Sequence, residues 1–167
     1  MSAADAVRVV RNGDTIVVPT AVGEPPALLA ALSEQRRDFR DVQVSQILAV
    51  RKFAYLDPET VEHVRHTAYF YSGATRPGGK EGWVDFIPAY FSEMPALINR
   101  GLMPADVVFT MASPMDEHGF FSLALAADYT MAAIDRARAV VLEVNPNVLF
   151  ANGDCHIHVF QVTALCE

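Results

Sequence analysis

The chain has 167 residues, 51% of them hydrophobic and 20% charged, a length that suits one domain with a full core and is short for two. Its formal net charge of -7 excludes a broad surface for nucleic acid or an anionic membrane, because such surfaces need a basic face. A few local cations could still hold a single phosphorylated ligand. No segment reaches the roughly 20 apolar residues that cross a bilayer, so we expect a soluble, cytoplasmic protein.

Cys155 and Cys166 are the two cysteines of the chain. They form neither a CxxC motif nor an evenly spaced framework. We expect them to be reduced thiols, which agrees with a cytosolic protein.

Short β-branched, apolar segments alternate with helix-like segments along the chain. The first unit is a strand at 15–20, the glycine turn AVGEPP and a helix over 27–32. A second helix start follows, with Asp57 as the N-cap and Pro58 at the first helical position. The other expected strands are 42–50, 67–72, 105–113, 120–127, 139–145 and 156–162. The remaining expected helices are 87–100 and 129–138, and 73–82 is the most loop-like stretch.

This alternation predicts the α/β class, with a mostly parallel sheet and flanking helices on both faces. In such sheets, ligands bind at the loops beyond the carboxyl ends of the strands. The loops 19–26, 73–82 and 113–119 are expected to share that edge. We therefore look for functional residues in these three loops.

The segment SPMDEHGFFSLA, residues 113–124, places two carboxylates, a histidine and a glycine after a buried strand. Asp116 has a side chain that readily forms a turn, and an ordinary surface loop explains the whole segment equally well. His118, beside Gly119 at a strand end, could instead donate to a ligand oxygen or act as an acid or base. From the residues alone, both interpretations stay open.

The segment DCHIH suggests a metal site, because His156 and His158 share one face of a strand beside Asp154 and Cys155. Two imidazoles without a third ligand at matched spacing do not define such a site, and we expect no metal.

Two glycine-containing loops have weaker signals. Gly23 and Glu24 lie in AVGEPP, which is either an anion-binding turn before a helix or a tight turn alone. Gly73, Arg76 and Lys80 lie in GATRPGGKEG, which could reach a phosphate or carboxylate or remain a solvated loop. There is no GxSxG elbow, and no Ser/His/Asp triad can be assembled.

Five segments in chain order resemble the N-terminal domain of the acetyl-CoA hydrolase/transferase family, which includes 4-hydroxybutyrate and butyrate CoA-transferases. The most specific part is SPxDEHGxFSLxxxxDYTxAAI. The segments are IVVPTAVGEPPALLAAL, FYSGATRPGGKEGWVDFIP, ADVVFTMASPMDEHGFFSLALAADYTMAAIDRA, VVLEVNPNV and GDCHIHVFQV. One departure is NVLFANGD, where relatives tend to have Met-Pro-Arg before the glycine.

The resemblance implies the NagB/RpiA/CoA-transferase-like fold and makes residues 1–167 a single domain like the first of two similar halves. In that family, a glutamate of the second half attacks the acyl-CoA thioester, giving a glutamyl anhydride and then a glutamyl-CoA thioester. No glutamate of this chain lies in that motif. We therefore expect the catalytic half to be absent from this chain and the chain alone to be inactive.

The resemblance also implies a set of residues that face substrate or coenzyme A, with Asp116 and His118 as orienting groups and Gly119 allowing close backbone approach. Glu117 as the nucleophile is the weaker alternative. The set is Gly23, Glu24, Gly73, Arg76, Ser113, Asp116, His118 and Gly119.

Coenzyme A, as acyl-CoA, is the only cofactor implied. The expected partners are a short-chain carboxylate, a C-terminal half or second subunit, and further copies of the chain. A non-catalytic acyl-CoA-binding or assembly module is the alternative function. A sugar-phosphate isomerase would rest on fold analogy alone.

Overall fold

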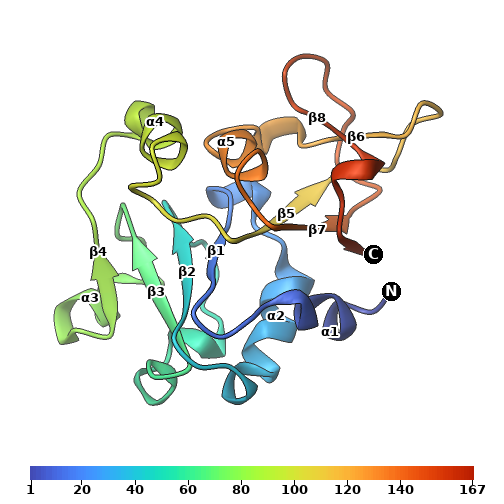
Figure 1. Ribbon diagram of the computed structural model, residues 1–167. Helices are drawn as coiled ribbons and strands as arrows, with labels where there is room; N and C mark the ends of the chain where they lie inside the picture. Colours follow the sequence, from blue (N-terminus) through green and yellow to red (C-terminus); the bar gives the residue numbers. More distant parts are fainter.

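Strand β1 (Thr15–Val17) lies at the centre of a seven-stranded parallel sheet in the order β4-β3-β2-β1-β5-β7-β9 (Figure 1). The computed structural model describes residues 1–167, except for the side chain of Leu125. This sheet confirms the expected α/β class. The other strands are β2 (Val42–Gln46), β3 (Val64–Ala68), β4 (Val84–Phe86), β5 (Val107–Ala112), β7 (Ala139–Val144) and β9 (Ala164–Cys166).

The direction of strand addition reverses at β1. The chain first adds β2, β3 and β4 on one side of β1, and then returns to place β5 on the other side. Ile16 of β1 is therefore opposite both Val44 of β2 and Val107 of β5. Such a reversal opens a crevice at the carboxyl ends of the two diverging strands, which is where ligands bind in open α/β sheets.

Helices cover both faces of the sheet (Figure 1). α1 (Ala3–Ala6) and α2 (Pro26–Glu34) pack on one face, where Leu28 and Leu32 are fully buried. α4 (Met94–Asn99) and α5 (Thr130–Ile134) pack on the other face, while α3 (Arg76–Glu81) lies beside β4. Burial on both sides explains why β5 (VVFTMA) and β7 (AVVLEV) are apolar over most of their length.

A small antiparallel pair, β6 (Phe120–Ser122) and β8 (His156–His158), extends beyond the main sheet. Phe121 is opposite Ile157, and both side chains are buried in the core that contains α4 and α5. The pair thus anchors the segment that follows β5.

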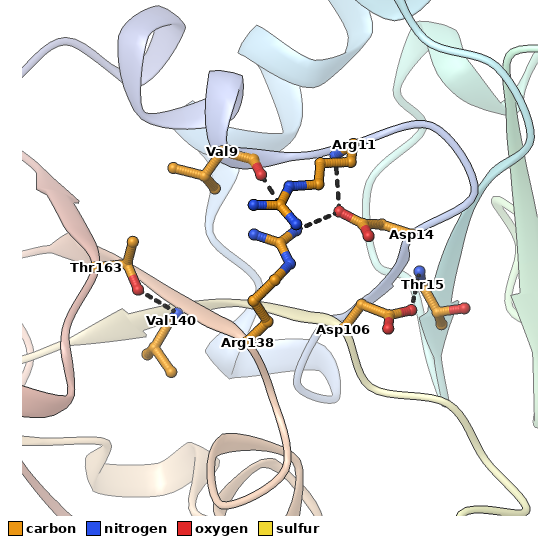
Figure 2. Close-up of polar contacts among 8 residues, drawn as sticks. All are labelled: Val9, Arg11, Asp14, Thr15, Asp106, Arg138, Val140 and Thr163. Carbon is orange, nitrogen blue, oxygen red and sulfur yellow. Dashed lines mark hydrogen bonds and ion pairs between the residues drawn. The ribbon is translucent and has the colours of Figure 1, made fainter.

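Polar side chains tie the amino ends of the strands together (Figure 2). Arg138, before β7, forms an ion pair of 2.6 Å with Asp14, before β1. Asp106, before β5, accepts a hydrogen bond of 2.8 Å from the Thr15 amide. This edge of the sheet is braced by its own side chains, and the candidate loops lie at the opposite, carboxyl edge.

Several sequence predictions of elements are wrong in their boundaries. The expected loop 73–82 contains helix α3, and β4 and β9 were not predicted. The strand expected at 67–72 is β3, which begins three residues earlier and ends at Ala68. The helix expected after Asp57 is only the 3₁₀ turn Pro58–Thr60.

Backbone geometry explains two further differences. The helix expected at 87–100 is α helix only from Met94, after a 3₁₀ turn at Phe91–Glu93, and Pro88 disfavours helical geometry at Ile87. The strand expected at 120–127 ends at Ser122, and Ala124 has a φ of 50° in the left-handed region. The strand expected at 156–162 ends at His158. Among the described residues, no helix is long and apolar enough to cross a membrane.

Candidate functional site

The loop between β5 and β6 is organised by the Asp116 carboxylate. Its Oδ1 atom accepts hydrogen bonds from the amides of His118 at 3.0 Å and Phe120 at 2.7 Å. Both hydrogen bonds lower the pKa of Asp116 below its ordinary value, and the bond from Phe120 has the larger effect. Gly119 has a φ of 86°, which suits glycine at the turn. Asp116 is therefore engaged in shaping the loop.

Ser113 closes the base of the same loop. Its hydroxyl donates to the Pro114 carbonyl at 2.9 Å and accepts from the Ser122 amide at 2.9 Å. The side chain is buried. Ser113 thus ties the end of β5 to the end of β6 and does not reach the surface.

His118 and Glu117 extend from the tip of this loop into solvent. Their side chains are 73% and 88% exposed, and His118 Nε2 lies 3.6 Å from Glu117 Oε1. Neither residue lines the two cavities described below. The structure gives Glu117 no buried environment of the kind that activates a nucleophile.

A cavity of about 290 Å³ opens at the point where β1 and β5 diverge. Gly23 lines it, and a Cβ atom built on Gly23 would lie 2.2 Å from the Ala126 Cβ. The glycine is thus required by the protein's own packing at this crevice. The lining is Val22, Gly23, Met111, Leu123, Ala124, Ala126, Asn147, Val148, Leu149 and Ala151.

Glu24 is buried behind this cavity. Its Oε2 atom accepts hydrogen bonds from Gln46 Nε2 and from the Val50 amide, each at 3.0 Å. Gln46 Nε2 also donates to the Pro19 carbonyl at 3.0 Å. Glu24 therefore joins the loop after β1 to the loop after β2, and its other oxygen, Oε1, has no hydrogen-bond partner among the described residues.

A larger cavity of about 650 Å³ lies at the carboxyl ends of β2 and β3. Gly73 and Arg76 line it. The sequence-predicted residues thus separate into three places: Gly23 and the buried Glu24 near the crevice, Gly73 and Arg76 in this second cavity, and the remaining four on the β5–β6 loop.

Asp128 and Tyr129 brace the crevice and were missed as functional candidates, although they belong to the quoted DYT segment. Asp128 accepts hydrogen bonds from the Thr20 amide at 3.0 Å and the Thr130 amide at 2.9 Å, and burial raises its pKa. The Tyr129 hydroxyl contacts the backbone of both Val18 and Ile47. These contacts fix the loops after β1 and β2.

The two histidines of DCHIH make local contacts. His156 Nε2 lies 2.8 Å from the Ala151 carbonyl oxygen, and His158 Nδ1 accepts from the Phe160 amide at 3.3 Å. Cys155 is a buried free thiol, as is Cys166. Within the described part of the chain, no group of three or more His, Cys, Asp or Glu side chains could hold a metal ion.

Exposed apolar side chains follow the carboxyl ends of five strands of the main sheet. Each of five loops carries one that is more than half exposed, although isolated exposed apolar residues would be expected anywhere on the surface. Exposed apolar side chains on neighbouring loops are typical of surfaces that contact a partner or ligand. The five are Val22 after β1, Val50 after β2, Phe70 after β3, Met115 after β5 and Leu149 after β7.

Comparison with known proteins finds CoA transferases among the relatives of this chain. The chain is 39% identical over 166 residues to a succinyl-CoA:cyclohexane-1-carboxylate CoA transferase of Geobacter metallireducens, covering 99% of this chain and 38% of that protein. It is 32% identical to a 4-hydroxybutyrate coenzyme A transferase of Clostridium kluyveri, over 100% of this chain and 39% of the relative. The chain therefore spans about two fifths of the length of these relatives.

Solved structures agree with these matches. RipA from Yersinia pestis superposes with a TM-score of 0.88 at 28% identity, over 99% of this chain and 41% of that chain. A 4-hydroxybutyrate CoA-transferase from Porphyromonas gingivalis gives a TM-score of 0.82 at 28% identity, over 99% and 38%. The expected CoA-transferase-like fold is confirmed. Residues 1–167 match the model of the acetyl-CoA hydrolase/transferase N-terminal domain, and the chain belongs to that family.

Proposed function

We propose that this chain is the N-terminal half of an acyl-CoA:carboxylate CoA-transferase, which moves coenzyme A between an acyl-CoA and a carboxylic acid. The observation that carries this proposal is the edge of the sheet at which five loops each expose one apolar side chain around two cavities. A second half that closes over this edge would bury those side chains and enclose the substrate.

The covalent chemistry belongs to the second half in this proposal. Its glutamate carboxylate attacks the thioester carbonyl and releases the CoA thiolate, which leaves a glutamyl anhydride. The thiolate then attacks the glutamyl carbonyl and releases the carboxylic acid, giving a glutamyl-CoA thioester. The acceptor acid reverses these steps and leaves as the new acyl-CoA.

The present half contributes binding and orientation. The Gly23 loop forms a wall of the crevice. The Glu24 carboxylate holds it through the Val50 amide, and the Tyr129 hydroxyl holds it through the Val18 carbonyl. His118 reaches outward from a loop that Asp116 shapes, so its ring can meet a ligand in the closed cleft. Contacts with the non-reacting part of acyl-CoA supply binding energy that lowers the barrier of the transfer.

Trapping of the covalent intermediate tests this division of roles. The complete protein is incubated with acyl-CoA, treated with hydroxylamine, and digested for peptide mass spectrometry. We expect the modified glutamate in the second half and an unmodified Glu117. The Glu117→Gln variant should retain transfer between acyl-CoA and carboxylate.

Modification of Glu117, or CoA transfer by residues 1–167 alone, would overturn the proposal. Binding of acyl-CoA without transfer by the complete protein would favour the non-catalytic module instead.

A further inference from the structure

The cavity at the carboxyl ends of β2 and β3 has the size of a small-molecule site. Its volume of about 650 Å³ falls within the roughly 300–1,000 Å³ that is usual for ligand pockets. Most of its lining is apolar, including Leu48, Val50, Phe70 and Pro77. The buried Glu24 carboxylate fixes one wall, because it accepts from the Val50 amide.

The opposite wall is built by close packing of helix α3 on two aromatic rings. A Cβ atom on Gly79 would lie 2.3 Å from Tyr71 Cζ, and one on Gly78 would lie 2.6 Å from Trp83 Nε1. Trp83 Nε1 also donates to the Leu56 carbonyl at 3.1 Å. Tyr71 and Trp83 are therefore held in place before any ligand arrives, which lowers the entropic cost of binding.

Among the charged side chains that line the cavity, one guanidinium has no ion-pair partner within the described residues. Lys52 Nζ lies 3.0 Å from Asp57 Oδ1, so these two lining residues neutralise each other. Arg76, the third charged residue of the lining, has no carboxylate partner among the described contacts. A guanidinium presents paired N–H donors that match the two oxygens of a carboxylate.

We propose that this cavity binds a monocarboxylic acid with a bulky apolar body, with the Arg76 guanidinium on the carboxylate and the hydrocarbon against Trp83 and Tyr71. One unpaired guanidinium in the described lining matches one carboxylate. The phosphorylated end of coenzyme A would instead bring several negative charges and require more cations. The inference rests on the proposed function for its place in the reaction, where the bound acid is the acceptor, but the binding itself can be measured separately.

Trp83 is the only tryptophan of the chain, so its fluorescence reports on this cavity directly. The probe is cyclohexanecarboxylate, which does not absorb where indole is excited, titrated into the 167-residue chain. We expect a saturable change in emission, and about fivefold weaker binding by Arg76→Gln, as suits an exposed charge-assisted pair. Neutral cyclohexanecarboxamide should bind the unmodified chain about as weakly as cyclohexanecarboxylate binds Arg76→Gln.

Lys80→Gln is the matched control, because Lys80 lies on the same helix as Arg76 and does not line the described cavity. It should leave the affinity unchanged. Ala74→Leu fills the cavity without altering charge and should also weaken binding of the ring acid. Circular dichroism checks that each variant is folded.

Equal affinity of Arg76→Gln and the unmodified chain, or the absence of a saturable change, would overturn the proposal. Tighter binding of adenosine 3′,5′-bisphosphate than of the carboxylate would also overturn it. The transferase assay of the complete protein separates the two claims. Carboxylate binding without transfer would contradict the proposed function alone, whereas transfer without carboxylate binding would contradict this inference alone.

Discussion

The hydroxyl of Tyr129 donates a hydrogen bond of 2.5 Å to the backbone carbonyl of Val18, just beyond the end of β1. The same hydroxyl accepts from the Ile47 amide at 3.2 Å, just beyond β2. A fully buried side chain adjoining α5 therefore joins the loops of two neighbouring strands on the side where the crevice opens. The positions of both loops therefore depend on the Tyr129 hydroxyl.

Replacing Tyr129 by phenylalanine should lower the free energy of unfolding by about 1–3 kcal/mol, because it leaves a buried carbonyl and amide without their partner. Urea denaturation followed by circular dichroism measures the change. Tyr90→Phe is the control, since that side chain is 77% exposed, and it should leave stability unchanged. A loss for Tyr129→Phe no larger than that of the control would contradict the bracing role.

Replacing Asp116 by alanine should loosen the β5–β6 loop, since the carboxylate accepts from the His118 and Phe120 amides. We expect faster hydrogen exchange at these two amides, measured by NMR, with a smaller effect for Asp116→Asn, whose amide oxygen can still accept. Glu117→Gln should not change either rate. Unaltered protection in Asp116→Ala would show that the turn forms without the side chain.

A methyl group at Gly79 should destabilise the protein, because it would lie 2.3 Å from Tyr71 Cζ. The expected cost is about 1–3 kcal/mol, as for other overpacked sites. Gly73→Ala is a matched control in the same region, since nothing lies within 4 Å of its added Cβ. Thermal unfolding of both variants measures the difference, and equal melting temperatures would contradict the close packing described.

His66, on β3, should make stability depend on pH. Its ring is stacked on Tyr55 with centroids 6.0 Å apart, and burial lowers its pKa to about 4 from an ordinary value near 6.5. The unfolded chain therefore takes up a proton that the folded chain does not. Stability is complete above pH 6.5 and is lost progressively between pH 6.5 and 4, by about 2 kcal/mol at pH 5.

Urea denaturation at pH 7 and pH 5 tests this dependence. His66→Phe should remove about 2 kcal/mol of the stability that the unmodified chain loses at pH 5. His118→Gln, at an exposed ring, is the control and should keep the dependence of the unmodified chain. If the variant at His66 lost as much stability on acidification as the unmodified chain, its buried neutral state would be contradicted.

The parallel sheet could be predicted because burial on both faces leaves a direct mark on the sequence, as in VVFTMA of β5. Short edge strands leave no such mark. β4 and β9 have three residues each, and they are strands because of the neighbours with which they pair. Helix α3 contains two glycines and a proline, so its local propensity argued against the helix that its contacts with Tyr71 and Trp83 stabilise.

The sequence predicted which loops carry the candidate residues, but not what each side chain contacts. Sequence reasoning placed the three loops after the carboxyl ends of strands, where the structure has them, and recognised the turn-forming tendency of Asp116. It had no means of showing that Glu24 points inward to Gln46 or that Ser113 is buried, because both depend on contacts between segments distant in sequence. The bracing role of Tyr129 likewise depends on loops more than eighty residues upstream.

The brace at the amino ends of the strands, formed by Arg138 with Asp14 and by Asp106 with Thr15, lies on the edge opposite the exposed side chains of Val22, Val50 and Phe70. Substitutions of Val22 should therefore combine nearly additively with those of Val50 or Phe70, because Val22 lines a different cavity, whereas substitutions of Val50 and Phe70, which line the same cavity, should couple. A small combinatorial library at these three positions would vary the linings of both cavities and leave the brace unchanged.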